Sequence, residues 1–355
     1  RCLTTAEVEK ITGEPGRYRA TIARHPRRVN NKCTACGACE EVCPVERPNE
    51  FNFAMDTTKA VYLPFEMAYP MQYAIDPAVC LGAECGKCVE ACPYQAIDLE
   101  MQPERVDVEV QAVIWATGWD PFEAEKIEGL GFGTYRNVIT NVMMERLASI
   151  GGPTAGKIER PSDGKEIQSV AFVQCAGSRD ENYLKHCSGV CCMASLKQTR
   201  YVREQYPDAQ IYIFYIDVRT PGRLEDFYSA VQKDEKVQLI KGKVAKITED
   251  GAADLVVEAE DTLSGDRVSQ KVNLVVLATG IVPADATGCV EFDGVLQDGG
   301  LQDGGLQKDE HGFLTNDQPL AGLMGAGCAK RPVDVAMCVR DATGTALKAL
   351  QSCVE

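Results

Sequence analysis

The chain has 355 residues, of which 45% are hydrophobic and 25% are charged, and its formal net charge is −15. A chain of this length can form two or three domains with cores of their own, and its composition excludes a disordered, collagen-like or coiled-coil protein. The negative charge argues against nucleic acid as a partner, and no apolar run approaches the roughly 20 residues that a membrane-spanning helix needs.

Seventeen cysteines are an unusual number for this length, and most of them are clustered rather than scattered. The sequence starts at Arg1 and shows no signal peptide, so a secreted disulfide framework is not the expected use of these cysteines. The clustering instead indicates metal binding in a reducing compartment. The opening segment 6–22 is typical of the middle of a domain rather than of its beginning.

Two cysteine arrays come next along the chain. They are Cys33-x2-Cys36-x2-Cys39-x3-Cys43-Pro44 and Cys80-x4-Cys85-x2-Cys88-x3-Cys92-Pro93. Both have the spacing of the bacterial ferredoxin run, which binds [4Fe–4S] clusters, and the second has a longer first gap. Gly37 and Gly86 allow each loop to close tightly around its cluster.

In two-cluster ferredoxins the fourth cysteine of each run binds the other cluster. We therefore expect one cluster on Cys33, Cys36, Cys39 and Cys92, and the other on Cys80, Cys85, Cys88 and Cys43. The alternative is a pair of zinc sites, but these usually show paired Cys-x2-Cys units rather than a triple followed by Cys-Pro. The linker 45–73 is expected to pack on the host domain.

The segments that flank the arrays indicate a nucleotide-binding flavoprotein. Residues 106–116 form a predicted strand that ends in Ala-Thr117-Gly118, and residues 274–280 form another that ends in Ala-Thr279-Gly280. In flavoenzymes with two dinucleotide domains, such a turn marks where the chain crosses between the FAD and NAD domains.

Between these turns lies a predicted βαβ unit with strands at 169–174 and 210–216 and a helix at 190–204. Asp217 follows the second strand, where an NAD-binding unit would have its ribose-binding acid. The Gly-x-Gly-x-x-Gly fingerprint is replaced by Cys175-Ala-Gly-Ser-Arg. We expect a Rossmann-like domain that does not bind NAD(P).

A third group of cysteines in this unit consists of Cys175, Cys187, Cys191 and Cys192, which occur within 18 residues. Four thiolates suffice for a third [4Fe–4S] cluster. The alternatives are a redox-active disulfide and buried, inert thiols, and the vicinal pair disfavours a stable structural bridge. His186 could bind a metal, but a solvated loop position is the simpler interpretation, and His25 and His311 have no convergent partners.

The C-terminal part contains a glycine-rich turn, Leu320-Ala-Gly-Leu-Met-Gly325-Ala-Gly327-Cys328, followed by a helix that extends to about Leu350. In FAD enzymes a short strand ends at such a turn, and the helix after it begins near the flavin or its pyrophosphate. The predicted flavin contacts are Gly325, Gly327, Cys328, Pro332, Asp334 and Val335, together with Thr117, Gly118, Thr279 and Gly280 of the two Ala-Thr-Gly turns. An ordinary helix start is the alternative.

The repeated Leu-Gln-Asp-Gly-Gly at 296–306 is interpreted as a surface loop. The scattered cysteines, Cys2, Cys289, Cys328, Cys338 and Cys353, are interpreted as structural.

The order of these motifs resembles the A subunit of heterodisulfide reductase over nearly the whole chain. The resemblance includes Asn137-Val-Ile-Thr140, Arg160-Pro-Ser-Asp-Gly164, Cys175-Ala-Gly-Ser-Arg-Asp180, Cys187-Ser-Gly-Val-Cys-Cys-Met193 and the Pro332-x-Asp334-Val335 ending. Because no second ferredoxin follows before Glu355, the chain looks most like the A subunit of the quinone-interacting membrane-bound oxidoreductase.

This resemblance implies a cytoplasmic FAD and iron–sulfur protein, associated with the membrane through partner subunits that carry flavin, iron–sulfur and haem groups. It implies electron transfer between a quinone-linked membrane partner and adenylylsulfate reductase. It also implies a third cluster at the Cys175 group. The alternative within the family is a heterodisulfide reductase A-type subunit that passes electrons to a disulfide reductase partner.

The expected fold is α/β, with two Rossmann-like domains of the FAD/NAD(P) type and an inserted two-cluster ferredoxin α+β module. Because no Gly-x-Gly-x-x-Gly lies near Arg1, we expect the N-terminal part of the FAD domain to be missing. The expected divisions are a FAD-domain remnant at 1–28, the ferredoxin module at 29–104, the FAD domain and crossover at 105–165, the NAD-like domain at 166–280, and the C-terminal FAD part at 281–355.

Three other functions are alternatives to electron transfer. A flavin-based disulfide reductase would use Cys191 or Cys192 as its nucleophile. An NAD(P)H-linked enzyme is disfavoured by the missing glycine fingerprint, and a zinc scaffold by the array spacing. No general acid and base constellation occurs in the sequence, which agrees with an electron-transfer role and with no catalytic residue of its own.

Overall fold

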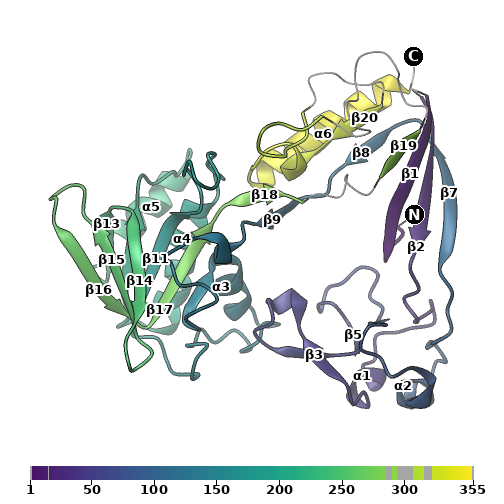
Figure 1. Ribbon diagram of the computed structural model, residues 1–355, viewed down its shortest axis with the longest axis horizontal. Helices are drawn as coiled ribbons and strands as arrows, with labels where there is room; N and C mark the ends of the chain where they lie inside the picture. The colour runs from purple at the N-terminus through teal and green to yellow at the C-terminus, as the bar shows by residue number, and fades with distance from the viewer. Residues whose placement is uncertain (1, 15, 285–289, 294–306, 316–321, 354–355) are drawn as a thin grey trace.

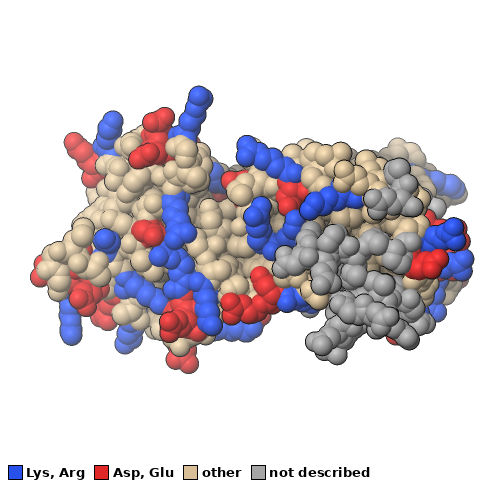
Figure 2. All heavy atoms as spheres, turned by 90° about the horizontal axis from the view of Figure 1, so that it is seen from above, with Lys and Arg blue, Asp and Glu red and all other residues tan. Residues whose placement is uncertain are grey.

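The computed structural model describes residues 2–14, 16–284, 290–293, 307–315 and 322–353 (Figure 1). A parallel sheet with its helices lies at one end of the molecule, and a four-stranded sheet and a long C-terminal helix lie at the other. The module that contains the two cysteine arrays lies between them on one side. On the face seen in Figure 2, basic and acidic side chains are interspersed, so the net charge of −15 does not form a single-sign patch there.

The parallel sheet has five strands in the order β10-β17-β11-β12-β13, and every neighbouring pair is parallel. Their bounds are β10 Val138–Thr140, β11 Ser169–Ala176, β12 Gln210–Tyr215, β13 Val237–Lys241 and β17 Leu274–Thr279. The apolar runs at 169–174, 210–216 and 274–280 thus form strands as the sequence predicts. All three are buried because layers cover both faces of the sheet.

Helices α3 (Asn141–Leu147), α4 (Cys191–Gln205) and α5 (Leu224–Gln232) cover one face of this sheet. A core of buried apolar residues fills the space between them, with Phe172, Leu196 and Ile213 among its members. The helix predicted at 190–204 is α4. The expected α/β fold of the Rossmann type is therefore confirmed for this domain.

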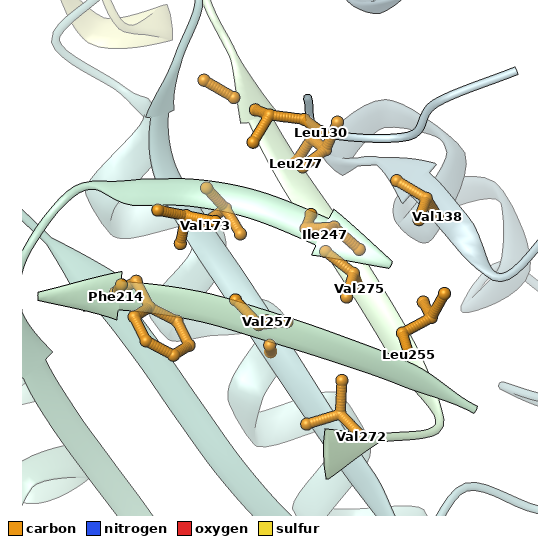
Figure 3. Packing of buried hydrophobic residues seen from close by; sticks show 14 of the residues in the cluster. Leu130, Val138, Val173, Phe214, Ile247, Leu255, Val257, Val272, Val275 and Leu277 are labelled. Atoms are coloured by element: carbon orange, nitrogen blue, oxygen red, sulfur yellow. The ribbon is translucent and has the colours of Figure 1, made fainter. Parts of the chain in front are cut away.

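The other face is covered by an antiparallel sheet that was not predicted. It consists of β14 (Val244–Glu249), β15 (Leu255–Glu260) and β16 (Arg267–Val272). Leu255 and Val257 of this sheet belong to the same buried core as Val173 and Leu277 of the parallel sheet (Figure 3). Each such buried side chain stabilises the fold by about 1.5–3 kcal/mol relative to an exposed one.

Two strands connect the parallel-sheet domain with the rest of the chain. They are β9 (Trp119–Pro121) and β18 (Ile281–Pro283), which pair antiparallel with Ile281 opposite Pro121 and Pro283 opposite Trp119. Figure 1 shows them as the link between the two ends of the molecule. The chain enters the domain through β9 and returns through β18, so each predicted Ala-Thr-Gly turn adjoins one strand of the crossover.

The four-stranded sheet has the order β19-β1-β2-β7, with bounds β1 Ala6–Glu14, β2 Arg17–Arg24, β7 Glu104–Val110 and β19 Glu291–Asp293. The predicted single strand at 106–116 is wrong. β7 pairs with β2, the chain bends at Gln111, and β8 (Val113–Trp115) pairs with β20 (Leu323–Gly325) instead. The bend lets one segment serve two sheets.

The module between β2 and β7 contains both cysteine arrays. Its elements are α1 Ala38–Glu41, β3 Glu46–Pro48, β4 Thr57–Lys59, β5 Val61–Tyr62, β6 Ala74–Ile75 and α2 Lys87–Ala91, with 3₁₀ turns at Glu50–Asn52 and Gly82–Glu84. The linker packs on the parallel-sheet domain, as expected. Arg146 Nε donates to Asn52 Oδ1 at 2.7 Å, and the Arg146 guanidinium lies 4.4 Å from the centre of the Phe51 ring.

The C-terminal part begins with β20, continues through a 3₁₀ turn at Gly327–Ala329 and ends in α6 (Val335–Ser352). Elsewhere in the chain, another 3₁₀ turn at Ala124–Lys126 follows β9. Helix α6 buries Thr345 and Ala349 on its inner face but exposes Val335, Val339 and Leu350. No helix in the described ranges combines the length and apolarity needed to span a membrane. The predicted loop at 296–306 and Cys289 lie outside the described residues.

Candidate metal centres

The first pocket of the ferredoxin-like module is lined by cysteines from both arrays. Three of them come from the first array and the fourth from the second, namely Cys33, Cys36, Cys39 and Cys92. Tyr73 covers one side of this pocket, and its hydroxyl donates to Glu40 Oε2 at 2.7 Å. Apolar contacts from Ala96 and Ile97 shield the pocket from water.

The second pocket repeats this arrangement with the arrays exchanged. It is lined by Cys80, Cys85, Cys88 and Cys43, and Val61 and Ile75 supply its apolar wall. Helices α1 and α2, which carry the arrays, contact each other. The structure therefore brings the eight cysteines together in the crossed grouping that the ferredoxin run predicts.

Backbone amides point at the sulfur atoms in both pockets. The amides of Ala35 and Gly82 donate to Cys33 and Cys80 at 3.4 Å, and that of Ala96 donates to Cys92 at 3.3 Å. Gly37 and Gly86 precede α1 and α2 with φ of 85° and 56°, a left-handed conformation in which glycine is favoured. Such amides stabilise negative charge on thiolates and cluster sulfides.

Two thiols, one in each pocket, have a raised pKa. Burial, followed by the neighbouring Cys33, raises the pKa of Cys39 to about 12. Burial, followed by Cys80 and Cys43, raises the pKa of Cys88 as well. Bound iron would supply the positive charge that offsets this cost, because metal ligands bind as thiolates.

The cysteines of the two pockets do not converge on the position of a single ion. Among the described residues, no three Cys, His, Asp or Glu side chains converge closely enough to hold one metal ion. A tetrahedral zinc ion draws its thiolates to about 2.3 Å from one centre. A four-iron cluster distributes its ligands over four metal atoms, so it suits a pocket lined by four more widely separated cysteines.

The third cysteine group lies at the carboxyl edge of the parallel sheet. Cys175 is near the end of β11, and Cys191 and Cys192 begin α4. The neighbours of β11 are β17 and β12, so the group occupies the point where the strand order reverses. Ligands of doubly wound α/β folds bind at this point, and the positive end of α4 favours thiolates there.

The four thiols of this group influence one another. Burial, then Cys175, Cys192 and Cys187, raise the pKa of Cys191 to about 12. Burial and Cys192 raise the pKa of Cys175 to about 11, while Arg179 acts in the opposite direction. Four neighbouring cysteines, of which Cys175 and Cys191 are buried, would repel one another as thiolates, so the group is suited to bind a cation.

One side of the third group opens to solvent through a pocket. Arg179, Asp180, Glu181, Lys185, Cys187 and Arg219 line it. Arg179 forms an ion pair with Asp217, and Arg219 Nε lies 3.6 Å from the same carboxylate. Asp217, the predicted counterpart of a ribose-binding acid, is thus engaged by two arginines.

The histidines are not arranged as the sequence predicts. His186 is not a solvated loop residue, because its Nε2 lies 2.9 Å from the Ile281 carbonyl oxygen and its ring packs 4.8 Å from that of His311. His311 therefore does have a partner, and the Phe313 ring meets the His186 ring edge-on, with 5.3 Å between the ring centres. The two histidines are far apart in the sequence, and no local pattern signals their contact.

The predicted flavin contacts are divided between two places. Gly325, Gly327 and Cys328 lie between β20 and α6, and Asp334 accepts from the Met337 amide at the start of α6. Thr117 follows β8 and donates to the Ala284 carbonyl at 3.0 Å, and Gly118 has a φ of 81°. Pro332 and Val335 precede and begin α6.

Thr279 and Gly280 lie elsewhere, beside the third cysteine group. The Cys191 thiol donates to the Thr279 carbonyl at 3.4 Å, and a Cβ on Gly280 would lie 2.2 Å from Ser178 Oγ. The structure therefore does not bring the two Ala-Thr-Gly turns together. They stand at opposite ends of the β9–β18 pair.

Comparisons with known proteins agree with the two array pockets. Residues 29–96 match the model of the 4Fe-4S dicluster domain. An iron–sulfur A subunit of CoB–CoM heterodisulfide reductase from Methanopyrus kandleri is 41% identical over 350 residues, which are 98% of this chain and 53% of that protein. The A subunit of the same enzyme from Methanocaldococcus jannaschii is 43% identical over 285 residues, 79% of this chain and 43% of the relative.

The chain spans about half the length of the curated relatives it matches. Among solved structures, thioredoxin reductase from Lactococcus lactis aligns with a TM-score of 0.43 and 14% identity, covering 83% of this chain and 86% of the other. The homologues are thus oxidoreductase subunits of the heterodisulfide reductase A type that carry a 4Fe-4S domain.

Proposed function

We propose that this chain is an electron-transfer subunit of a heterodisulfide reductase-type complex, with two [4Fe–4S] clusters in the array pockets and a third at the Cys175 group. The observation that carries the proposal is the convergence of eight cysteines in two crossed sets of four. Ferredoxin clusters transfer one electron at a time, so two adjacent clusters form a short relay.

The role of the third group follows from its position. Cys175, Cys187, Cys191 and Cys192 occupy the switch point of a Rossmann-like sheet, where the cofactor of an NAD(P) domain would bind. Because the glycine fingerprint is absent and Asp217 is paired with Arg179, a metal cluster is the better occupant of this place. A thiol nucleophile at Cys191 or Cys192 is the competing assignment.

FAD is the further cofactor that we propose for the assembled protein. The N-terminus of α6 follows the Gly325–Gly327 turn and supplies the positive helix end that suits a phosphate. Thr117, Gly118 and Pro332 are the further residues that we assign to this site. When bound, the flavin exchanges electrons in pairs with one partner and singly with the clusters.

Relatives favour one of the two complexes that the sequence resembles. They are named as CoB–CoM heterodisulfide reductase subunits, so a disulfide reductase partner is the better proposal for this chain. The other candidate function is electron transfer between a quinone-linked, haem-bearing membrane partner and adenylylsulfate reductase. Its only support is the resemblance of the motifs.

Cofactor analysis of the anaerobically purified chain tests the proposal. Three clusters predict about twelve iron atoms and about twelve acid-labile sulfides per chain. Reduction followed by EPR spectroscopy should then show reducible cubane signals. Zinc without sulfide, or iron without a reducible signal, would contradict the proposal.

A further inference from the structure

Two cysteines outside the three groups face each other in the C-terminal part. Cys328 lies in the 3₁₀ turn after β20, and Cys338 lies in the first turn of α6, with the two Sγ atoms 3.6 Å apart. A disulfide requires about 2.05 Å between the sulfur atoms. The pair therefore needs to close by roughly 1.5 Å, which small rotations of the two side chains can supply.

Contacts around the two cysteines fix their positions relative to each other. Lys330 Nζ lies 2.7 Å from Asp341 Oδ1, and the Gly327 amide donates to Asp341 Oδ2 at 2.8 Å. Asp341 thus fixes the turn that carries Cys328 against the helix that carries Cys338.

The two thiols differ in exposure and therefore in role. Cys328 is buried and its sulfur lies 3.5 Å from the Val333 carbonyl oxygen, whereas Cys338 is only half-buried. Cys338 is thus accessible to a small reagent, and Cys328 is placed to attack Cys338 from inside. This division into an attacking and a resolving thiol is the usual arrangement of exchange-active pairs.

A purely structural use explains these cysteines less well. Buried cysteines often act as small apolar side chains. Here each sulfur has the other sulfur as a neighbour, and Cys338 is only half-buried. Metal binding would need further ligands, and no such group is found among the described residues.

We infer that Cys328 and Cys338 form a redox-active thiol pair that exchanges with low-molecular-weight disulfides. The Cys338 thiolate attacks one sulfur of the small disulfide, forming a mixed disulfide and releasing one thiol. Cys328 then attacks Cys338, which forms the Cys328–Cys338 bond and releases the second thiol. Two electrons and two protons pass from the protein to the small disulfide, so the exchange is balanced.

The pH should influence the rate of this exchange. Burial, followed by the contact with Cys328, raises the pKa of Cys338 above its usual value. The thiolate fraction at neutral pH is therefore small, and exchange should accelerate as the pH rises. The pair contains no residue of the three cluster groups, although Cys328 lies in the turn where we propose that FAD binds.

Peptide mapping of the full chain tests the inference. The protein is equilibrated anaerobically in glutathione buffers of increasing disulfide fraction, quenched in acid, alkylated while unfolded and digested with trypsin. Cleavage after Lys308, Lys330 and Arg340 gives peptides 309–330 and 331–340, each with a single cysteine. We expect the two alkylated peptides to be replaced by one disulfide-linked pair, with unchanged iron content.

Variants assign the two roles. Cys338→Ser should abolish the linked pair, and Cys328→Ser should accumulate a glutathione adduct on peptide 331–340 because the resolving thiol is absent. Cys353→Ser, in the turn after α6, is the matched control and should leave the linked pair unchanged. Recovery of both alkylated peptides from the most oxidising buffer, a persistent wild-type glutathione adduct, or linkage only with loss of iron would overturn the inference.

Discussion

The Cys191 thiol donates a hydrogen bond to the carbonyl oxygen of Thr279 at 3.4 Å, although the two residues are 88 positions apart. Cys191 begins α4, and Thr279 ends β17 just before the chain leaves the parallel-sheet domain. The third cysteine group therefore contacts the backbone through which the two ends of the molecule are connected. A change at this group can affect the crossover, and a change at the crossover can affect the group.

The crossed grouping of the arrays predicts which cysteine pairs act on one cluster. Cys43→Ser combined with Cys80→Ser should lose about four iron atoms per chain, because both residues line the same pocket. Cys43→Ser combined with Cys33→Ser should lose about eight, because Cys33 lines the other pocket. Iron and sulfide determination on the two double variants gives the answer. Equal losses would refute the crossed grouping.

The third group predicts a separate loss of iron. Cys187→Ser should remove about four iron atoms per chain while the EPR signals of the two array clusters stay unchanged. Cys2→Ser is the matched control, because Cys2 is exposed and belongs to none of the groups. If Cys187→Ser and Cys191→Ala both keep their full iron content but lose thiol turnover, the group is a redox thiol site instead.

Gly280 leaves no space for a larger residue. The Cβ of Gly280→Ala would lie 2.2 Å from Ser178 Oγ and 2.7 Å from Leu184 Cδ1. We expect overpacking to lower the free energy of unfolding by about 1–3 kcal/mol and to weaken cofactor retention at the third group. Urea denaturation measures the first effect and iron analysis the second. Gly251→Ala is the control, since its Cβ would meet open space. Equal stability of the two variants would contradict the prediction.

Asp180 makes the loop between Cys175 and Cys187 sensitive to pH. The hydrogen bond from Lys243 lowers the pKa of Asp180, which also accepts from the Asn182 amide at 2.9 Å. Because the folded pKa lies below the ordinary value of about 3.9, the ionised carboxylate stabilises the fold above that pH. The contribution is lost as the pH falls through the folded pKa.

Asp180→Asn should therefore reduce the free energy of unfolding at pH 7 by about 1 kcal/mol. The difference between wild type and variant should shrink as the pH is lowered from about 7 to about 3. Urea denaturation of both proteins in parallel measures it, and acid damage common to both cancels in the comparison. A difference that stays constant over this range would show that the carboxylate charge makes no contribution.

The sequence allowed the cysteine sites and the central strands to be predicted because these signals are local. The spacing of the arrays determines which cysteines line each pocket. A continuous apolar run such as 274–280 is typical of a buried strand. The second sheet was missed even though Leu255, Val257 and Ala259 alternate with exposed residues as a strand requires. The bend at Gln111 was missed because β7 and β8 together form one continuous β-like pattern.

Contacts between distant segments could not be predicted from one sequence. The ion pair of Arg179 with Asp217 and the ring contact of His186 with His311 depend on how the domain folds back at the sheet edge. The separation of Thr279 from Thr117 has the same origin. Both turns share a tripeptide, but the antiparallel course of β9 and β18 carries them to opposite ends of the crossover.

The pairing of β2 with β7 has a consequence for how such a protein can be varied. Arg24, where the chain leaves the four-stranded sheet, is the direct partner of Glu104, where it returns. Partners in an antiparallel pair are about 5 Å apart, so a short turn could join the two strands directly. The cysteine-array module is therefore an exchangeable cassette, and a host without it could keep the same sheet and gain or lose two clusters as a single unit.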